Sequence, residues 1–286
     1  MPSLKELVGQ ELDLPVDHRV RAMAEAIARK HGSASQAVLF YGSCLRQKQL
    51  DGMMLDFYLI VSSYREAYGT GWLAAANRLI PPNVFYFEHD GLAAKYAVLS
   101  LDDFHRLNGP ETANVSVWAR FAQPSRLAWC RPEARQAVID SVARAAPTLL
   151  AAAGRVAGEK PLDWWRRAFA LTYSAELRAE RTGKATSVVD MDRDRYEAFS
   201  EPAIAAIAAD SGAGVSWASR RLQGKLLSVL RLAKASATFA GGAEYIAWKI
   251  NRHAGTDIQL KPWQRRWPLL AAITLLPRLL RSGAVR

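Results

Sequence analysis

Residue types from which many functional sites are built are scarce in this sequence. Its 286 residues include two cysteines, Cys44 and Cys130, and five histidines without the spacing of metal ligands. Two cysteines cannot form a disulfide framework, so the composition predicts a reducing compartment and excludes a small zinc module. Half of the residues are apolar, which is enough for a substantial hydrophobic core.

The sequence also lacks the features of a secretory leader. Its first residues, MPSLKELVGQELDLP, carry acidic side chains and contain no apolar h-region. Near the other end, the apolar run at 269–276 lies between Pro268 and Pro277 and is too short for a transmembrane helix. These features predict a cytoplasmic location.

Acidic residues are nearly absent from the last quarter of the chain. Residues 215–286 contain 13 of the 38 Lys and Arg residues but two of the 27 Asp and Glu residues, which accounts for the whole net charge of +11. This asymmetry predicts contact with a polyanion, either nucleic acid or an anionic membrane surface. A merely solvated basic face is the alternative.

Tryptophan stands beside arginine in two segments, at 164–167 and 261–267. This pairing is typical of a membrane interface and is equally suited to stacking on nucleic-acid bases. The run at 269–276 fits a segment lying in such an interface, held by apolar burial and roughly 1 kcal/mol per nearby basic residue. A C-terminal helix docked on the protein core would have the same pattern.

Apolar periodicity divides the chain into three regions, and the fold class that it predicts is α/β. Residues 1–130 mix helices with short strands, residues 131–214 are helical in period, and residues 215–286 form the basic C-terminal region. The predicted strands are 37–41, 54–61, 84–87, 95–99 and 125–130. The predicted helices are 16–30, 64–80, 132–153, 163–182 and 194–209, with a linker at 210–214.

The stretch VLFYGSCLRQKQLDGMMLDFYLIV, at 38–61, carries the most specific pattern. Gly42 and Ser43 directly follow a buried strand, where a tight turn can aim backbone N–H groups and a hydroxyl at an anion. Asp56 stands inside the next apolar strand. Burying a carboxylate there costs several kcal/mol unless a positive group compensates, and a metal ion bound to a triphosphate is a suitable partner. The alternative is an ordinary turn, with Asp56 capping a neighbour at a strand end.

This order of strand, Gly-Ser turn and strand bearing an aspartate resembles the polymerase-β-type nucleotidyltransferase superfamily. The resemblance implies a mixed sheet with helices, in which the turn holds nucleotide phosphates and strand carboxylates hold Mg²⁺. The superfamily usually has a second carboxylate two residues after the first, whereas this chain has Tyr58.

Six segments are similar, in order and spacing, to motifs of the mitochondrial-type phosphatidate cytidylyltransferase family, also called the translocator assembly and maintenance family. They are YGSCLRQ at 41–47, MLDFYLIV at 54–61, PPNVFYF at 81–87, KYAVLS at 95–100, ARFAQP at 119–124 and LTYSAELR at 171–178. RLAKASATFAGG, at 231–242, is a weaker echo of a basic segment of that family. The chain departs from the motifs where Cys44 and Ala97 replace glycines and where Ala175-Glu176 replaces Gly-Asp.

The family resemblance implies an enzyme that transfers CMP from CTP to phosphatidic acid, giving CDP-diacylglycerol and pyrophosphate, with Mg²⁺ as cofactor. It implies that Gly42 and Ser43 bind the triphosphate and that Asp56 binds the metal. A phosphomonoester is substantially dianionic at neutral pH, so the attacking group needs little help from a general base. The protein must instead neutralise and align charge.

Five further residues are candidates for this site. Lys95 and Arg120 would hold phosphate groups, although a snorkelling lysine and an ordinary helix-end arginine are the alternatives. Glu176 would supply the missing carboxylate and Arg178 would bind the nucleotide, unless the two belong to a surface ion pair. Glu88, at a strand end, is a second candidate metal ligand.

The lipid substrate implied by the resemblance favours a membrane interface over docking on the protein core for the C-terminal segment. We therefore expect peripheral association of residues 215–286 with the inner face of the cell membrane, and no bound nucleic acid. Two alternatives stay open: a nucleotidyltransferase that modifies RNA or a protein, and a catalytically inactive membrane-binding relative.

Overall fold

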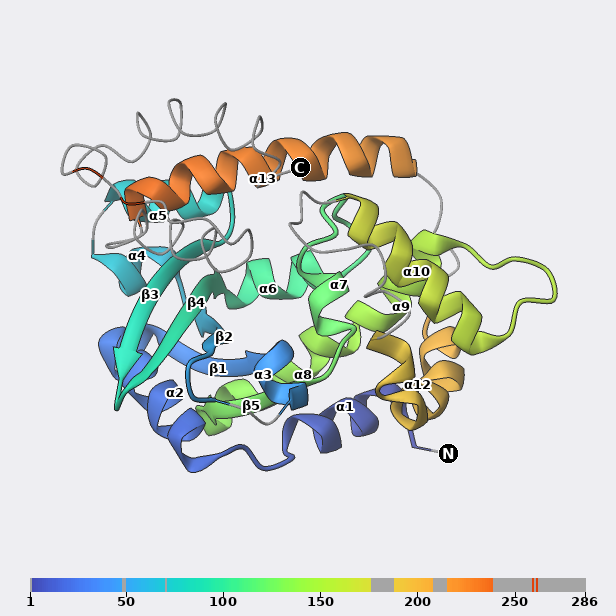
Figure 1. The fold of residues 1–286 in the computed structure, drawn as a ribbon, viewed down its shortest axis with the longest axis horizontal. Helices are drawn as coiled ribbons and strands as arrows, with labels where there is room; N and C mark the ends of the chain where they lie inside the picture. The colour runs from blue at the N-terminus through green and yellow to red at the C-terminus, as the bar shows by residue number, and fades with distance from the viewer. Residues whose placement is uncertain are drawn as a thin grey trace.

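The computed structural model describes residues 2–47, 50–69, 71–175, 188–207 and 215–238, together with Gln259 and Lys261. In these residues a mixed five-stranded sheet has helices on both faces (Figure 1). The α/β fold class predicted from the sequence is therefore confirmed. The linker at 210–214 and the run at 269–276 lie outside the described residues.

The sheet has the strand order β3-β4-β2-β1-β5. Its strands are β1 (Ser35–Tyr41), β2 (Met54–Val61), β3 (Asn83–His89), β4 (Leu92–Ser100) and β5 (Ser125–Cys130). Strands β2 and β4 are parallel, and the other neighbours are antiparallel. The parallel pair and β1 lie inside the sheet, and their side chains are mostly buried on both faces, which explains their nearly continuous apolar sequences.

Successive residues of the central strands face opposite hydrophobic clusters, as the strand period requires. Val38 and Phe40 of β1 belong to a cluster on the α2 side of the sheet. Helix α2 (His18–Lys30) presents Val20, Met23 and Ile27 to this cluster at helical spacing. Burying these apolar side chains fixes α2 across the face of the sheet.

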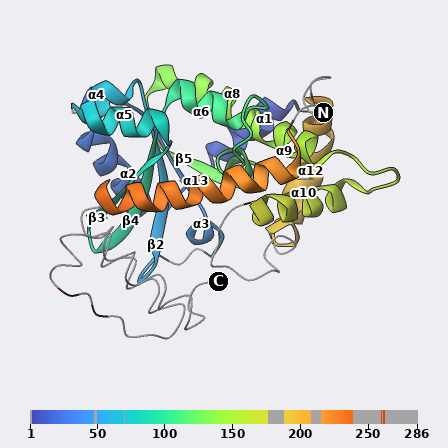
Figure 2. The ribbon, with the colours of Figure 1, turned by 90° about the horizontal axis from the view of Figure 1, so that it is seen from above.

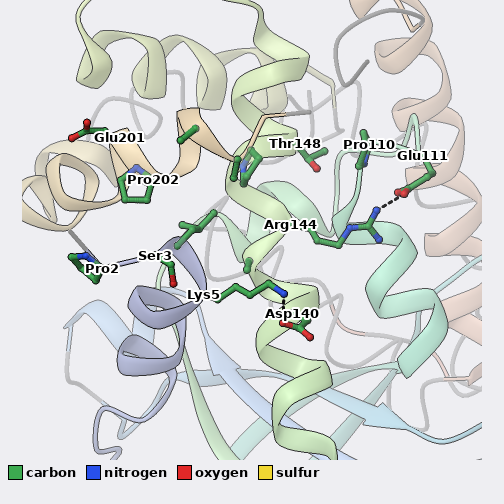
Figure 3. Close-up of a pocket in the computed structure, with 15 residues that line it drawn as sticks. Pro2, Ser3, Lys5, Pro110, Glu111, Asp140, Arg144, Thr148, Glu201 and Pro202 are labelled. Carbon is green, nitrogen blue, oxygen red and sulfur yellow. Dashed lines mark hydrogen bonds and ion pairs between the residues drawn. The ribbon is translucent and has the colours of Figure 1, made fainter. Parts of the chain in front are cut away.

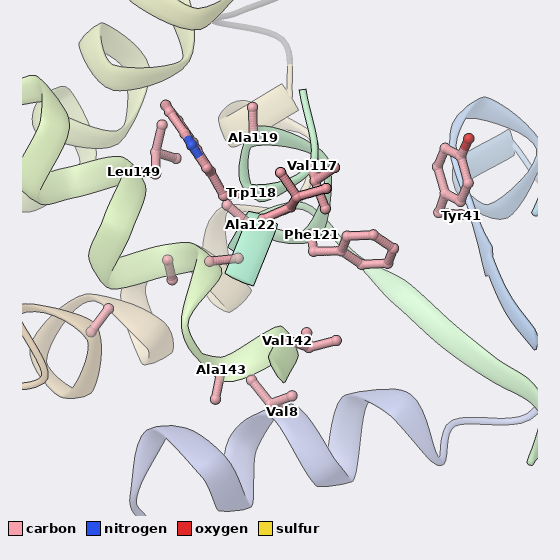
Figure 4. Close-up of a cluster of buried hydrophobic side chains, with 14 of the residues drawn as sticks. Val8, Tyr41, Val117, Trp118, Ala119, Phe121, Ala122, Val142, Ala143 and Leu149 are labelled. Carbon is pink, nitrogen blue, oxygen red and sulfur yellow. The ribbon is translucent and has the colours of Figure 1, made fainter. Parts of the chain in front are cut away.

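The opposite face is covered by a larger set of helices. Leu39 and Tyr41 of β1 join a cluster that also contains Trp118, Phe121 and side chains of the helices beyond (Figure 4). These helices are α1 (Leu4–Leu12), α6 (Leu101–Asn108), α7 (Trp118–Phe121), α8 (Arg135–Ala143), α9 (Ala145–Ala153), α10 (Pro161–Ala175) and α12 (Arg193–Ala205). One cluster thus takes residues from both sides of position 130, where the sequence predicts a domain boundary; that boundary stays a prediction.

Helix α13 (Trp217–Thr238) crosses the molecule and contacts both α10 and β3 (Figures 1 and 2). Near its start, Arg220 is buried and donates hydrogen bonds to the carbonyl oxygens of Thr112 and Ala113, at 3.2 and 3.1 Å. The Arg220 guanidinium also lies 5.8 Å from the ring of Trp118. These contacts attach α13 to the body of the protein.

The predicted strands agree with the observed ones, and β2 and β5 have the predicted bounds. The predicted helix at 64–80 is wrong in one respect: it is two helices, α4 (Tyr64–Tyr68) and α5 (Gly71–Leu79), because Gly69 at φ 60° ends the first. The predicted helix at 132–153 likewise divides into α8 and α9. Pro147, in the first turn of α9, has no N–H to continue the hydrogen bonding of α8.

Candidate active site

The predicted Gly-Ser turn and the buried aspartate lie against each other. Tyr41, the last residue of β1, pairs with Asp56 on β2, and the chain then turns at Gly42, with φ 95°, into α3 (Ser43–Gln47). A Cβ atom at Gly42 would stand 2.9 Å from Asp56 Oδ2. Glycine is needed here both for the positive φ and for the close approach of the carboxylate.

The positive group nearest to this carboxylate in the described structure is Lys95. Asp56 and Lys95 are register partners on the parallel strands β2 and β4, and Lys95 Nζ lies 3.1 Å from Asp56 Oδ1. The Asp56 side chain is 17% exposed and that of Lys95 is 31% exposed. Asp56 Oδ1 is buried and accepts no hydrogen bond of good geometry, so the ion pair is its neutralising contact. A lysine therefore does part of the work that the sequence assigns to a metal ion.

Beside this pair, a cavity of about 270 Å³ collects basic side chains from three distant segments of the chain. Lys95 comes from β4, Arg120 from α7, and Arg231 and Lys234 from α13. The other lining residues are Tyr41, Tyr58, Pro82, Val84, Ala97 and Ser116. All the charged residues that line this cavity in the described structure are basic, which makes it suited to an anion.

Backbone and hydroxyl groups hold the two cations of α13 at the cavity. Arg231 Nε donates to the carbonyl oxygen of Pro81 at 2.8 Å, and its Nη1 donates to Ser116 Oγ at 2.9 Å. Lys234 Nζ donates to the carbonyl oxygen of Pro82 at 2.8 Å and also to that of Ile80. The segment before β3 therefore fixes both side chains where α13 passes over the sheet.

Burial and neighbouring charge change the acid–base properties of the cavity. Burial, with a contribution from the Arg231 charge, lowers the pKa of Lys234 to about 7. Burial also raises the pKa of Tyr41, whose ring lies 4.9 Å from the Arg120 guanidinium. Tyr41 therefore stays neutral at physiological pH, while Lys234 titrates within the physiological range.

The number of carboxylates near the turn determines what kind of metal site is possible. Tyr58, at the position of the usual second carboxylate, is buried with its ring 5.4 Å from that of Tyr41 and 5.1 Å from that of Phe121. Among the residues that the structure describes, no group of three metal-ligating side chains occurs. The buried Asp56 Oδ1 fits a Mg²⁺ ion that takes its other ligands from nucleotide phosphates and water, and the described residues do not fit an ion held by protein alone.

The structure does not bring Glu88 to this carboxylate. Glu88 is an exposed residue of β3, which β4 separates from β2, and it accepts a hydrogen bond from the hydroxyl of Tyr86. Two strand spacings amount to about 10 Å, and Glu88 is also two residues out of register with Asp56. Glu176 and Arg178 lie outside the described residues, so their assignments stay predictions.

Several lining residues have no role in the sequence-based assignment, among them the polar or charged residues Tyr41, Ser116, Arg231 and Lys234. Arg231 and Lys234 belong to the basic segment that weakly echoes the family, and their spacing of three puts them on one helix face. That spacing could have indicated that the two side chains line the same site. Ser116 carries no such signal, because its position depends on the turn before α7.

A larger open groove of about 860 Å³ lies elsewhere, between α1, α8, α9 and α12 (Figure 3). Its basic side chains face acidic ones: Lys5 Nζ lies 2.8 Å from Asp140, and Arg144 bonds to Glu111. The groove is therefore larger than the cavity beside Asp56 but lacks its excess of positive charge.

Comparison with known proteins finds no sequence match and a distant structural similarity. No family model matches the sequence, and no curated protein matches it at the significance required. Among solved structures, the chain is similar to a nucleotidyltransferase-like protein from Exiguobacterium sibiricum 255-15 at 10% identity. The match covers 92% of this chain and 91% of that chain, with a TM-score of 0.27. At this TM-score the similarity does not establish a common fold, and the function proposed below rests on the side chains of the site.

Proposed function

We propose that the protein is a nucleotidyltransferase that uses CTP and a phosphate-bearing acceptor, and specifically a phosphatidate cytidylyltransferase. The observation that carries this proposal is the grouping of a glycine turn, one buried carboxylate and four basic side chains on one face of the sheet. Nucleotidyl transfer to a phosphomonoester brings several negative charges together, and neutralising them is the main task of such a site.

Different residues of the chain would neutralise different parts of this negative charge. Gly42 and Ser43 would receive the triphosphate, with Asp56 Oδ2 against the turn. Lys95, paired with Asp56, would stand between the triphosphate and the cavity. Arg120 would offset the negative charge of the entering phosphate. When bound, Mg²⁺ supplies charge neutralisation on the triphosphate, and Asp56 is the described residue that would hold it.

A lipid acceptor requires contact with a membrane, and α13 supports this part of the proposal. Leu222, Leu226, Val229 and Leu230 of α13 are exposed, although helices usually bury such residues. They lie on the same helix as Arg231 and Lys234, which line the cavity. None of the helices in the described ranges combines the length and apolar content needed to cross a bilayer. We propose that this apolar stripe and the basic C-terminal region contact the anionic membrane surface.

The direct test is incubation with labelled CTP, Mg²⁺ and vesicles containing phosphatidic acid. We expect label in the lipid fraction as CDP-diacylglycerol and release of pyrophosphate. Vesicles of phosphatidylcholine, which lack a phosphomonoester, are the control. Label transferred to RNA or to a protein, with none in lipid, would replace the lipid acceptor by one of those substrates.

Asp56→Asn provides the accompanying prediction. We expect turnover to fall at least about 100-fold, because the substitution removes the charge that pairs with Lys95 and holds the metal. The circular dichroism spectrum should remain that of the folded protein, and the thermal unfolding midpoint should fall only modestly, because Lys95 loses this partner but stays partly exposed. Undiminished activity in this variant would contradict the role assigned to Asp56.

One observation favours a second candidate, a membrane-binding relative without catalysis. Tyr58 fills the position of the second carboxylate, and Lys95 already pairs with Asp56. In that case the protein would float with anionic vesicles while calorimetry with CTP and Mg²⁺ gave no heat of binding. Saturable CTP binding would exclude this candidate.

A further inference from the structure

We propose that the cavity beneath α13 is a recognition site for a phosphomonoester dianion, separate from the nucleotide-binding turn, with Arg231 and Lys234 as its recognition residues. This inference rests on the proposed function, because it assigns the acceptor phosphate to the cavity and the nucleotide to the turn. The binding site can still be tested separately from the enzyme activity, because binding of a phosphomonoester can be measured without turnover.

Size is the first argument. The cavity measures about 270 Å³, whereas sites for drug-sized molecules start at about 300 Å³. It is therefore too small for a whole nucleoside triphosphate and large enough for one phosphate group with the first atoms of its ester. Gly42, Ser43 and Asp56 are not among the residues that line the cavity, so the nucleotide proposed to bind at the turn would lie outside it.

The kind of charge is the second argument. Lys95, Arg120, Arg231 and Lys234 reach the cavity from three separate elements. Gathering like charges in a half-buried space is unfavourable, and burial together with the Arg231 charge lowers the pKa of Lys234; a bound anion would offset this cost. A phosphomonoester carries nearly two negative charges at neutral pH, and a phosphodiester carries one. The cavity should therefore prefer the monoester.

The fixed orientation of the α13 cations is the third argument. Arg231 is held by Pro81 and Ser116, and Lys234 by Pro82 and Ile80. Cations that are already oriented lose little conformational freedom when an anion arrives, which favours tight and selective binding. Lys225, on the same helix, is exposed and does not line the cavity, so it offers a matched comparison.

The experiment measures binding of four soluble probes by calorimetry in the absence of turnover. Dioctanoyl phosphatidate, glycerol 3-phosphate and inorganic phosphate carry the dianion, and dioctanoyl phosphatidylcholine is the diester control. We expect the three dianions to bind and the diester not to bind. A lipid source predicts that phosphatidate binds more tightly than the two small phosphates, and equal affinities would assign the cavity to a water-soluble phosphate.

The variants separate the cavity from the turn. Lys234→Met should weaken dioctanoyl phosphatidate about tenfold or more, which corresponds to losing one charge-assisted contact, and Lys234→Arg should restore most of the affinity. CTP binding should change less than twofold in both. Lys225→Met, which removes the same charge from the same helix, should leave both affinities unchanged. Equal weakening in Lys225→Met, or loss of CTP binding with unchanged phosphatidate binding in Lys234→Met, would overturn the proposal.

A measurement on the unaltered protein covers the case in which Lys234→Met fails to fold. Acylation of lysines by a dilute anhydride, followed by mass spectrometry, reports the reactivity of each side chain. Dioctanoyl phosphatidate should protect Lys234 and Lys95 and leave Lys225 as reactive as before. Unchanged labelling of Lys234 at saturating phosphatidate would refute the site, whereas absent turnover with intact protection would refute only the proposed enzyme activity.

Discussion

At the scale of single residues, Gly42 is the position at which the turn and the buried carboxylate depend on each other. A side chain there would need φ 95° and would place its Cβ 2.9 Å from Asp56 Oδ2. Gly69 has a positive φ of 60° as well, but a Cβ atom at Gly69 would meet nothing within 4 Å. A side chain at Gly69 would therefore cost only backbone strain, whereas a side chain at Gly42 would also collide with Asp56.

We predict that Gly42→Ala lowers the free energy of unfolding by about 1–2 kcal/mol through backbone strain and also abolishes CTP binding, because Asp56 must move. Gly69→Ala should lose less stability than Gly42→Ala, because it has the backbone strain without the contact, and CTP binding should stay intact. Denaturant unfolding and calorimetry measure the two effects. CTP binding that survives in Gly42→Ala would contradict the close packing of turn and carboxylate.

Lys234 gives a prediction about pH. Its pKa of about 7 means that the side chain is charged below pH 7 and loses its proton above it. The phosphate, with a second pKa near 6, remains mostly dianionic above pH 6.5. Among the described residues that line the cavity with Lys234, the charged groups are Arg231 on α13, Arg120 on α7 and Lys95 on β4, and Tyr41 on β1 is neutral.

We therefore expect the dissociation constant for dioctanoyl phosphatidate to rise about tenfold between pH 6.5 and pH 8.5, as the Lys234 charge is lost. In Lys234→Met the same titration should be much flatter. Calorimetry in buffers of different ionisation enthalpy should also detect proton uptake on binding near pH 8. An identical pH profile in both proteins would exclude Lys234 as the titrating group.

Some of these residues could be identified from the sequence and others could not. Gly42, Asp56 and Lys95 stand in or beside apolar strands, where a glycine turn or a charge is conspicuous, and the strand pairing brings them together. The pairing of Asp56 with Lys95 could not be read from the sequence, because it depends on the register of two strands that are separated by a helical connection and β3. Arg231 lies 115 residues beyond Ser116, and local patterns carry no information on that contact.

At the scale of elements, α13 carries both the cations of the cavity and the exposed apolar stripe. Its docking is close: a Cβ atom at Gly224 would overlap the carbonyl oxygen of Ala175 on α10. Alanine is the better helix former by about 1 kcal/mol, so propensity alone would make Gly224→Ala stabilising. The overlap with the Ala175 carbonyl oxygen makes the expected effect of Gly224→Ala destabilising instead.

We predict that Gly224→Ala destabilises the protein by about 1 kcal/mol or more and weakens phosphatidate binding, because α13 must shift and carries Arg231 and Lys234 with it. Gln223→Ala, at the exposed neighbouring position, should be neutral or slightly stabilising. Thermal unfolding and phosphatidate calorimetry test both variants. A more stable Gly224→Ala protein with unchanged binding would show that α13 does not rest on α10 in this way.

The bounds of a strand were predicted correctly from the sequence where one apolar run formed the whole strand. The strands β2 and β5 have the bounds that their apolar runs predict. Helix prediction failed at junctions, such as Gly69 and Pro147, where one residue ends or starts a helix inside a longer periodic segment. Periodicity is insensitive to such interruptions because it averages over a window of many residues.

At the scale of the whole molecule, the excess positive charge belongs to residues 215–286, and α13 is the helix described in that region. In the sequence, basic residues therefore continue beyond α13. We expect an anionic surface to attract this part of the chain, which fits the lipid acceptor proposed above.

We predict that the protein floats with vesicles containing anionic lipid and that binding weakens steeply between 50 mM and 500 mM NaCl, because salt screens the attraction. Phosphatidylcholine vesicles should recover little protein at any salt concentration. Binding that is insensitive to salt would indicate that apolar insertion, and not charge, attaches the protein.

The Asp56–Lys95 pair has a consequence for assembly of the sheet. Strands β2 and β4 are parallel, apolar and buried on both faces, so their hydrophobic side chains alone would tolerate a slip along one another. A slip of one residue would turn Lys95 to the opposite face and leave two charges buried without a counterion. The two side chains that we propose to meet a substrate therefore also fix the register of β2 and β4. Replacing both by leucine should give a chain that still folds but in which β4 can settle in more than one alignment.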